Sequence, residues 1–421
     1  DRDAHPRDLV DDARKMNRPS FRRLTIASLA ALALATTAVP GSVVADDPPA
    51  LDEELIAEVL ELIAERYVDD DVIDGDTLSV GAIRGMVEAL GDDGHTQYLT
   101  EDEFKVEQEV LEGRVAGIGV VVDQRSGAPV VISVVDGSPA DREGLRAGDV
   151  IATVDGKETA RLPEGELAEL VRGRPATLVR LGIERPGEAA IQQFSILRAD
   201  VEIDPVTWAM APGSDVAVVR IVQFSVGSGH QVHEAIKQAR NEGATGYVLD
   251  LRGNPGGLVN ELLNAASAFL DEGVAFLERA RDTEPIEVSV DPDRAVDPDQ
   301  PVVALVDYGT ASSGEILAAA LRDNGRATVV GEQTFGTGTF LNTLRLSDGS
   351  ALRLGVREWL TPAGESVFRV GLAPDEEVAM PLGGMRLGPA DLLSLTPIDF
   401  ENSDDVPLRH AVRLVEAQAR P

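Results

Sequence analysis

The sequence predicts an α+β multidomain protein with an N-terminal helical region, a small β-rich domain and an α/β core. Apolar residues recur at helical spacing between Leu51 and Tyr67, whereas short β-branched runs separated by turn residues begin at residue 115. Beyond residue 205, strand-like apolar runs alternate with helix-like segments, which is typical of an α/β core with parallel strands. We expect a targeting segment at 1–45, the helical region at 46–112, the β-rich domain at 113–200, the α/β core at 201–395 and a C-terminal helix at 396–421.

The composition fits a folded chain and excludes several kinds of site. With 421 residues and 43% hydrophobic residues, the chain is long enough for two or three domains with full cores. It contains no cysteine, which excludes disulfides, a cysteine nucleophile and thiolate zinc. A net charge of −35 should repel nucleic acid and anionic lipid, so we expect it to serve solubility or adaptation to salt.

The first 45 residues are predicted to be a targeting segment. Met16 is a candidate start, and three arginines between residues 18 and 23 precede the apolar run Leu24–Val39. Small residues at 43–45 then provide a cleavage site, as in a secretory signal peptide. An uncleaved anchor is the alternative, although the run is short for a membrane span. We therefore expect export to the cell envelope, periplasmic or extracellular, with membrane tethering only if the signal stays uncleaved.

The region 46–112 is predicted to be mainly helical. Residues 51–67 carry their apolar side chains on one helical face, and a second helix-like segment covers Val80–Leu90. Thr100 and Glu103 have the spacing of a capping box at the start of a third helix.

The region 113–200 has the pattern of a small β domain. The stretch GSPADREGLRAGDVIATVDG, at 137–156, follows a strand–turn–strand pattern and closely resembles bacterial PDZ domains. The resemblance implies that Gly117, Ile118, Gly119 and Val120 form the loop whose N–H groups bind a peptide's terminal carboxylate. A peptide would then add as a strand near Ile118, opposite the Glu164–Val171 helix. The alternative is a β domain that only braces the fold.

A glycine-rich turn follows a predicted strand in the core. The run Tyr247–Gly257 ends in DLRGNPGG, and its glycines would let the backbone approach a ligand at a helix start. Taken alone, this run fits a tight turn or a weak phosphate loop. It lacks the Lys-Ser/Thr pair of a Walker loop, which disfavours nucleotide binding.

A serine lies at the next predicted strand-to-helix turn. The run Val306–Leu321 contains TASSGE, with Ser312 just before the helix-like segment Gly314–Leu321. Such a turn would present a serine hydroxyl outward as a nucleophile. Taken alone, Ser312 would more simply cap the helix that contains Glu315.

Together these motifs resemble the C-terminal processing (tail-specific) serine peptidase family. The resemblance continues through TFGTGTF and into GLAPDEEV, in the order that the family has. It implies a ClpP/crotonase-like core with Ser312 as the nucleophile. It also implies that the N–H groups of Gly256, Gly257 and Ser313 form the oxyanion hole. Under this resemblance, Ser312 is expected to be catalytic and not only a cap.

The chain departs from the family at the general base. Family members have a lysine in a TFGKG-like stretch and a glutamine four residues later, but this chain has Thr337 and Leu341. A threonine hydroxyl cannot accept the serine proton at neutral pH. Of the four lysines in the chain, only Lys237 lies in the core, on a helix pattern that predicts solvent exposure.

Histidine is the natural substitute base, and His95 is the preferred candidate. It lies in GDDGHTQYL, before the PDZ-like domain, where tricorn-type relatives place a catalytic histidine. Glu315 or Glu365 is a candidate to orient it, and a structural or solvent-facing His95 remains the alternative. His230 and His233 lack an evident third ligand, so no metal site and no cofactor are expected.

Two functions therefore remain open on the sequence alone. The first is an exported serine endopeptidase that binds C-terminal tails through its PDZ domain and cleaves through a Ser312 acyl-enzyme. The second is an inactive PDZ peptide-binding adaptor, a pseudoprotease of the cell envelope. In either case the expected partners are unfolded or tail-exposed proteins, not nucleic acid. A homodimer formed through the terminal helices is possible by resemblance.

Overall fold

The computed structural model describes most of the chain from residue 51 to residue 419. The described residues are 51–69, 72–91, 96–123, 129–135, 138–146, 148–160, 162, 166–185, 188, 190–202, 204–292, 295–381 and 384–419. The predicted targeting segment, residues 1–45, lies outside them. No helix in these ranges has both the length and the apolar character needed to cross a bilayer.

The chain divides into two compact units, Asp1–Asp74 and Gly75–Pro421. The first unit contains helix α1 (Glu53–Arg66), which confirms the helix predicted from the apolar spacing. Asp52 caps it, because its side chain accepts a hydrogen bond from the N–H of Leu55 at 2.9 Å. None of the side chains of α1 is buried.

The second unit begins with two helices separated by a short strand: α2 (Gly75–Glu88), β1 (Gln97–Leu99) and α3 (Glu101–Leu111). The predicted capping box opens α3. The N–H of Thr100 donates to Glu103 at 2.7 Å, and the N–H of Glu103 donates to the Thr100 hydroxyl at 3.3 Å.

An antiparallel sheet forms the β-rich domain. Its strands follow the order β3–β4–β5–β7–β8 with β6 paired to β5, and β2 pairs separately with β9. A core that includes Ile118, Val131 and Leu181 fills it. The elements are β2 (Arg114–Gly117), β3 (Val120–Asp123), β4 (Val130–Val134), α4 (Pro139–Arg142), β5 (Val150–Val154), β6 (Lys157–Glu158), α5 (Glu166–Val171), β7 (Leu178–Glu184), β8 (Gln192–Leu197) and β9 (Ala199–Glu202).

A six-stranded sheet forms the α/β core, in the order β10–β11–β12–β15–β16–β19. All of its neighbouring strands are parallel except β10 and β11. The elements around this sheet are β10 (Val206–Met210), β11 (Val216–Ile221), α6 (Ser228–Asn241), β12 (Gly246–Asp250), α7 (Val259–Ser267), β15 (Val302–Val306), α8 (Ser313–Asp323), β16 (Thr328–Gly331), β19 (Glu376–Glu377), α9 (Pro389–Leu392), α10 (Pro397–Glu401) and α11 (Val406–Gln418).

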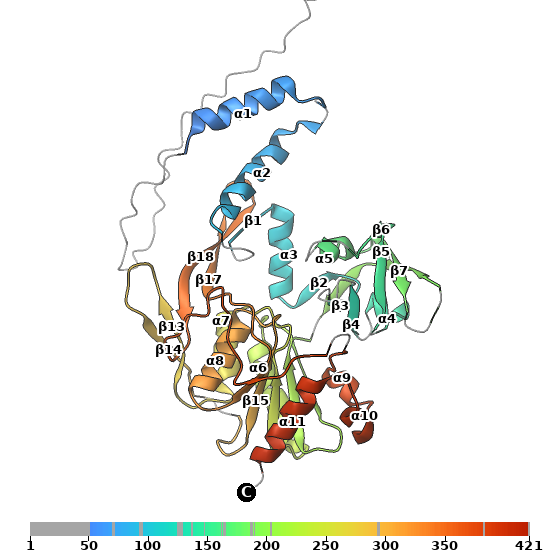
Figure 1. Ribbon diagram of the computed structural model, residues 1–421, viewed down its shortest axis with the longest axis vertical. Helices are drawn as coiled ribbons and strands as arrows, with labels where there is room; N and C mark the ends of the chain where they lie inside the picture. The colour runs from blue at the N-terminus through green and yellow to red at the C-terminus, as the bar shows by residue number, and fades with distance from the viewer. Residues whose placement is uncertain are drawn as a thin grey trace, which may run out of the picture. The chain divides into compact units, whose positions relative to one another are not determined.

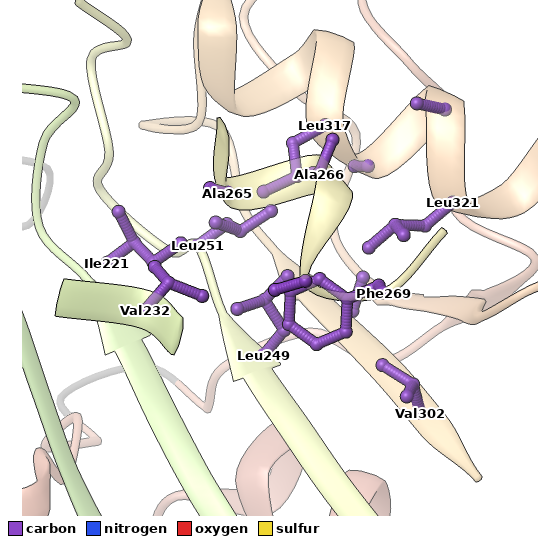
Figure 2. Packing of buried hydrophobic residues seen from close by; sticks show 14 of the residues in the cluster. Ile221, Val232, Leu249, Leu251, Ala265, Ala266, Phe269, Val302, Leu317 and Leu321 are labelled. Carbon is purple, nitrogen blue, oxygen red and sulfur yellow. The ribbon is translucent and has the colours of Figure 1, made fainter. Parts of the chain in front are cut away.

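Helices cover both faces of this sheet (Figure 1). Alternate residues of a strand point to opposite faces, so Val219 packs with α6, α7 and α8 while Val218 packs with α11. On the first face, the Phe269 ring lies between Leu249 and Val302 (Figure 2). Strands β12 and β15 are buried along their whole length, as parallel strands covered on both faces should be.

A second, five-stranded antiparallel sheet was not predicted. Its central strand is β18 (Ala351–Leu360), which pairs with β1, β13 (Val274–Arg279) and β17 (Thr339–Arg345). Strand β14 (Ile286–Ser289) pairs with β13. Strand β17 is largely exposed and mixes polar with apolar residues, so it lacks a strong alternating signal. Gln97 and Arg353 pair in this sheet but lie too far apart in the sequence for a local pattern to predict the pairing.

Buried ion pairs connect the C-terminal segment to the core sheet. The guanidinium of Arg252 donates to Asp250 at 2.8 and 2.9 Å and to Asp405 at 2.8 Å, and all three side chains are almost fully buried. Asp405 also caps α11 by accepting the N–H of Leu408. Burial alone would raise the pKa of Asp250, but the charges of Arg252 and Arg220 hold it well below its usual value.

We expect Arg252→Met to lower the free energy of unfolding by about 3–5 kcal/mol, because it removes the guanidinium that pairs with two buried carboxylates, Asp250 and Asp405. The depressed pKa of Asp250 contributes stability above the unfolded pKa, about 4, that is lost as the pH falls further. The variant should therefore lose less stability than the wild type on acidification. Denaturant unfolding at several pH values measures both effects.

Arg84→Met is the control for this prediction, because Arg84 pairs with Glu103 at 2.9 Å on the surface. It should change stability by less than about 1 kcal/mol. An equally small effect of Arg252→Met would contradict the role assigned to the buried pairs.

Candidate active site

Two turns meet at one edge of the core sheet. The glycine turn, residues 251–257, follows β12, and the serine turn, residues 307–312, follows β15. These strands are parallel neighbours, so their carboxyl ends lie side by side, which is where ligands bind in open α/β sheets. The structure thus brings together Ser312 and the glycines that the sequence analysis selected.

Ser312 has a strained backbone at the start of α8. Its φ of 51° and ψ of −119° are unusual for a residue with a side chain. It is the N-cap residue of α8, and its N–H donates to the side chain of Glu315 at 2.8 Å, as in a capping box. Ser312 thus occupies the cap position of the alternative prediction as well as the strand-to-helix turn of the catalytic one.

Gly256 lies directly against Ser312. A methyl group added at Gly256 would lie 2.6 Å from the Cβ of Ser312 and 3.0 Å from the backbone nitrogen of Ser313. The φ of Gly256 is also 99°, so only glycine fits both the space and the conformation. The backbone N–H of Gly256 donates to the side chain of Asn254 at 2.8 Å.

Gly257 and Ser313 place two further N–H groups beside Ser312. The Ser313 hydroxyl donates to the carbonyl of Gly257 at 3.0 Å, which ties the two residues together. Ser313 is the first residue of α8, where a backbone N–H lacks an intrahelical acceptor. Neither of these two N–H groups donates to an acceptor among the described residues.

Asn254, which the sequence analysis did not select, connects the two turns. Its side-chain amide donates to Ile221 at 2.9 Å, and its backbone carbonyl accepts the N–H of Ala311 at 2.9 Å. Its side chain is fully buried. The DLRGNPGG motif contained this residue, but only the fold shows what it binds.

The buried carboxylate of Glu315 fixes the backbone of Ser312. One oxygen accepts the N–H groups of Ser312 at 2.8 Å and Thr337 at 3.0 Å. The other accepts the Thr334 hydroxyl at 2.5 Å and the Gly336 N–H at 2.8 Å. These four donors fill the acceptor sites of the carboxylate, so Glu315 is a brace and not a free base. Burial raises the pKa of Glu315, and the four hydrogen bonds oppose that rise.

The departure from the expected lysine lies at the site itself. Because Thr337 and Ser312 donate to the same oxygen of Glu315, residue 337 is a close neighbour of the serine turn. Thr337 is buried, whereas Leu341, at the expected glutamine position, is exposed on β17. Lys237 pairs with Glu234 at 3.2 Å, and its side chain is 67% exposed, as predicted. No lysine of the core therefore faces Ser312.

The candidate base His95 lies outside the described residues. Its neighbour Thr96 is buried, and the Thr96 hydroxyl accepts the N–H of Gly355 at 3.1 Å. Gly355 in turn pairs with Leu341 across β17 and β18. Thr96 is thus attached to β18, which pairs with β17, the strand that follows Thr337.

The remaining candidates do not gather at Ser312. Glu365 pairs with Arg322 at 3.3 Å. His233 bonds to the Asn264 carbonyl at 3.0 Å, and His410 bonds to Glu376 at 2.6 Å. No cluster of three potential metal ligands occurs in the described parts of the chain.

Two exposed aromatic side chains, Tyr308 and Phe335, lie at the serine turn, and neither was selected from the sequence. The rings of Tyr308 and Phe335 lie 5.5 Å apart. The N–H of Phe335 donates to the carbonyl of Thr310 at 3.0 Å, which holds it beside the serine turn. They offer an apolar surface next to Ser312.

The predicted peptide loop lies at an open sheet edge. Gly117 ends β2, Val120 begins β3, and β3 is the terminal strand of its sheet among the described strands. Gly119 has a φ of 82°, and its carbonyl accepts the N–H of Val135 at 2.9 Å. Ile118 is buried in the domain core. A terminal strand with free backbone groups suits the addition of a peptide strand.

Comparison with known proteins assigns the family. Residues 215–378 match the model of peptidase family S41, and residues 130–185 match a PDZ domain. The carboxyl-terminal-processing protease of Synechocystis is 34% identical over 357 residues, which cover 83% of each chain. The chain belongs to this family of C-terminal processing peptidases. The predicted fold class and the predicted family are both confirmed.

Other relatives agree with this assignment. The carboxy-terminal processing protease CtpA of Bacillus subtilis is 34% identical over 73% of this chain. The match spans only 65% of that protein, and 60% of a probable CtpA-like serine protease of Staphylococcus haemolyticus. Among solved structures, a photosystem II D1 C-terminal processing protease is 28% identical, with a TM-score of 0.53 over 82% of this chain and all of the other.

Glu315→Gln tests the brace on Ser312. The amide NH₂ would face at least one backbone N–H, so we expect the free energy of unfolding to fall by about 1–3 kcal/mol. Chemical denaturation measures this. Glu103→Gln is the matched control, because Glu103 holds the same position of a capping box but is partly exposed. Equal, small effects of the two changes would contradict the brace.

Proposed function

We propose that the chain is an exported serine endopeptidase that captures C-terminal tails through its PDZ domain and cleaves peptide bonds at Ser312. The observation that carries this proposal is the strained Ser312 turn beside Gly256, Gly257 and the N–H of Ser313. Strained backbone conformations of this kind cluster at active sites, which supports a nucleophile at this position. The substrates would be unfolded or tail-exposed proteins.

The geometry supports an acyl-enzyme reaction. The Ser312 oxygen would attack the carbonyl carbon of the scissile bond while a base takes its proton. The N–H groups of Gly257 and Ser313 would hold the resulting oxyanion, and the Gly256 N–H would first have to leave Asn254. The base would then protonate the departing amine, leaving an ester on Ser312. A water molecule, deprotonated by the same base, would release the acyl group.

We propose His95 as this base. The hydrogen bond between Thr96 and Gly355 supports this proposal. It attaches Thr96, the residue after His95, to β18, which pairs with β17 just after Thr337. A neutral imidazole accepts a proton near pH 7, which neither Thr337 nor the fully occupied Glu315 can do.

A second function is favoured by one specific observation, the buried Thr337 at the lysine position. Without a base, the same fold would act as a PDZ adaptor that binds tails and cleaves nothing. The open edge of β3 serves that function equally well.

Ser312→Ala separates the two functions. The wild type should produce fragments of a loosely folded protein that are absent with the variant, because only the hydroxyl forms the ester. Mass spectrometry identifies the fragments, and calorimetry with a tail peptide checks that both proteins still bind. Binding without any fragments from the wild type would support the adaptor. His95→Ala, assayed in parallel, should also abolish the fragments if His95 is the base.

Thr337→Lys tests whether residue 337 faces the nucleophile. A buried lysine amine has a lowered pKa and can act as a base, so we expect cleavage at pH 8 to rise at least ~10-fold. Thr337→Met supplies similar bulk without a base and should not raise the rate. If Thr337→Lys folds but cleaves no faster than Thr337→Met, the placement of residue 337 is wrong.

A further inference from the structure

The carboxylate of Asp307 bridges the glycine turn and the serine turn. One of its oxygens accepts the N–H of Gly253 at 2.8 Å and the N–H of Gly309 at 2.9 Å. The two turns touch at this point, since a methyl group on Gly309 would lie 2.9 Å from the Cα of Gly253. Beside the contacts of Asn254, this side chain therefore holds the segment that carries the oxyanion donors against the segment that carries Ser312.

Arg386 holds the other oxygen of Asp307. One guanidinium nitrogen of Arg386 donates to Asp307, and another donates to the carbonyl of Arg252 at 3.1 Å. The Arg386 side chain is only 12% exposed and that of Asp307 7%. Arg386 thus compensates a nearly buried charge and binds the glycine turn from the same side chain.

The backbone around Arg386 is itself anchored. The next residue, Leu387, donates its N–H to Asp405 at 2.8 Å, and Asp405 also binds the buried guanidinium of Arg252. The C-terminal segment is therefore joined to the glycine turn twice, once through Arg252 and once through Arg386.

We propose that Arg386 is a positioning residue for the reaction at Ser312. It keeps the Asp307 carboxylate in place, and Asp307 keeps the Gly257 and Ser313 donors aligned with the nucleophile. Arg386 touches neither the nucleophile nor the donors, so it acts only through Asp307 and the two turns. This inference rests on the proposed peptidase function.

Removing the guanidinium would leave the Asp307 carboxylate nearly buried without its cation. The carboxylate would then turn toward water, because a buried charge without its cation is costly. This movement weakens its bonds to Gly253 and Gly309. Small displacements of oxyanion donors reduce the rate of the chemical step more than they reduce substrate binding.

Arg386→Gln in the full chain tests the proposal by two independent measurements. The first is hydrogen exchange, read by mass spectrometry on peptides that cover residues 253–257 and 307–312. The second is kcat and KM for a short peptide that the wild type cleaves in a Ser312-dependent manner. Arg185→Gln is the control, because Arg185 is 13% exposed and pairs with Asp149 at 2.7 Å in the β-rich domain.

We expect Arg386→Gln to accelerate exchange in both turns and to lower kcat on the order of 10-fold with little change in KM. Arg386→Lys, which keeps the charge, should recover part of kcat, and Arg185→Gln should change neither measurement. Asp307→Asn keeps an acceptor for the glycine N–H groups, so it serves as a second variant if Arg386→Gln does not fold.

Unchanged exchange in both turns of a folded Arg386→Gln protein would overturn the proposal. So would faster exchange with an unaltered kcat, because the contact would then hold the turns without positioning the reaction. If the wild type has no Ser312-dependent turnover, the proposed function fails instead. Hydrogen exchange alone then decides whether Arg386 holds the turns.

Discussion

The site depends on the buried carboxylate of Glu315. It accepts four hydrogen bonds, from Ser312 on one side and from the segment Thr334–Thr337 on the other. A buried carboxylate is costly unless donors satisfy it, so the chain must keep these two segments together. This bond and the close contact with Gly256 surround the strained backbone of Ser312 and help to hold it.

The sheet topology places that carboxylate where it is useful. Two parallel neighbours, β12 and β15, end at the same edge, and each continues into a turn with at least one positive-φ residue. Nearly buried ion pairs also hold this edge. Arg252 pairs with Asp405 and Arg386 pairs with Asp307, and both pairs join the C-terminal segment to the core. Polar contacts thus define the relative positions of the turns, while the apolar layers on both faces supply stability.

Local sequence patterns predicted much of the fold. The α/β alternation, the capping box at Thr100 and the helix after Ser312 all depend on short-range spacing, and the structure contains each of them. The antiparallel sheet built on β18 was missed because its pairings join segments far apart in the chain, with weak alternation in β17.

The site was predicted as a set of motifs and not as a network. Ser312, Gly256 and Gly257 were found because each lies at a recognisable strand-to-helix turn. Asn254 and Arg386 were not singled out, because a single polar residue has no signal until its partners are known. The pairing of Asp307 with Arg386, and of Arg252 with Asp405, exists only in three dimensions.

The most direct test of the central claim is covalent labelling of the purified chain with a fluorophosphonate, followed by peptide mass mapping. Our account predicts a single adduct on Ser312, because the proposed mechanism makes its hydroxyl the nucleophile. Labelling at Ser313 instead, or an unmodified Ser312 in a folded chain that binds tail peptides, would contradict it.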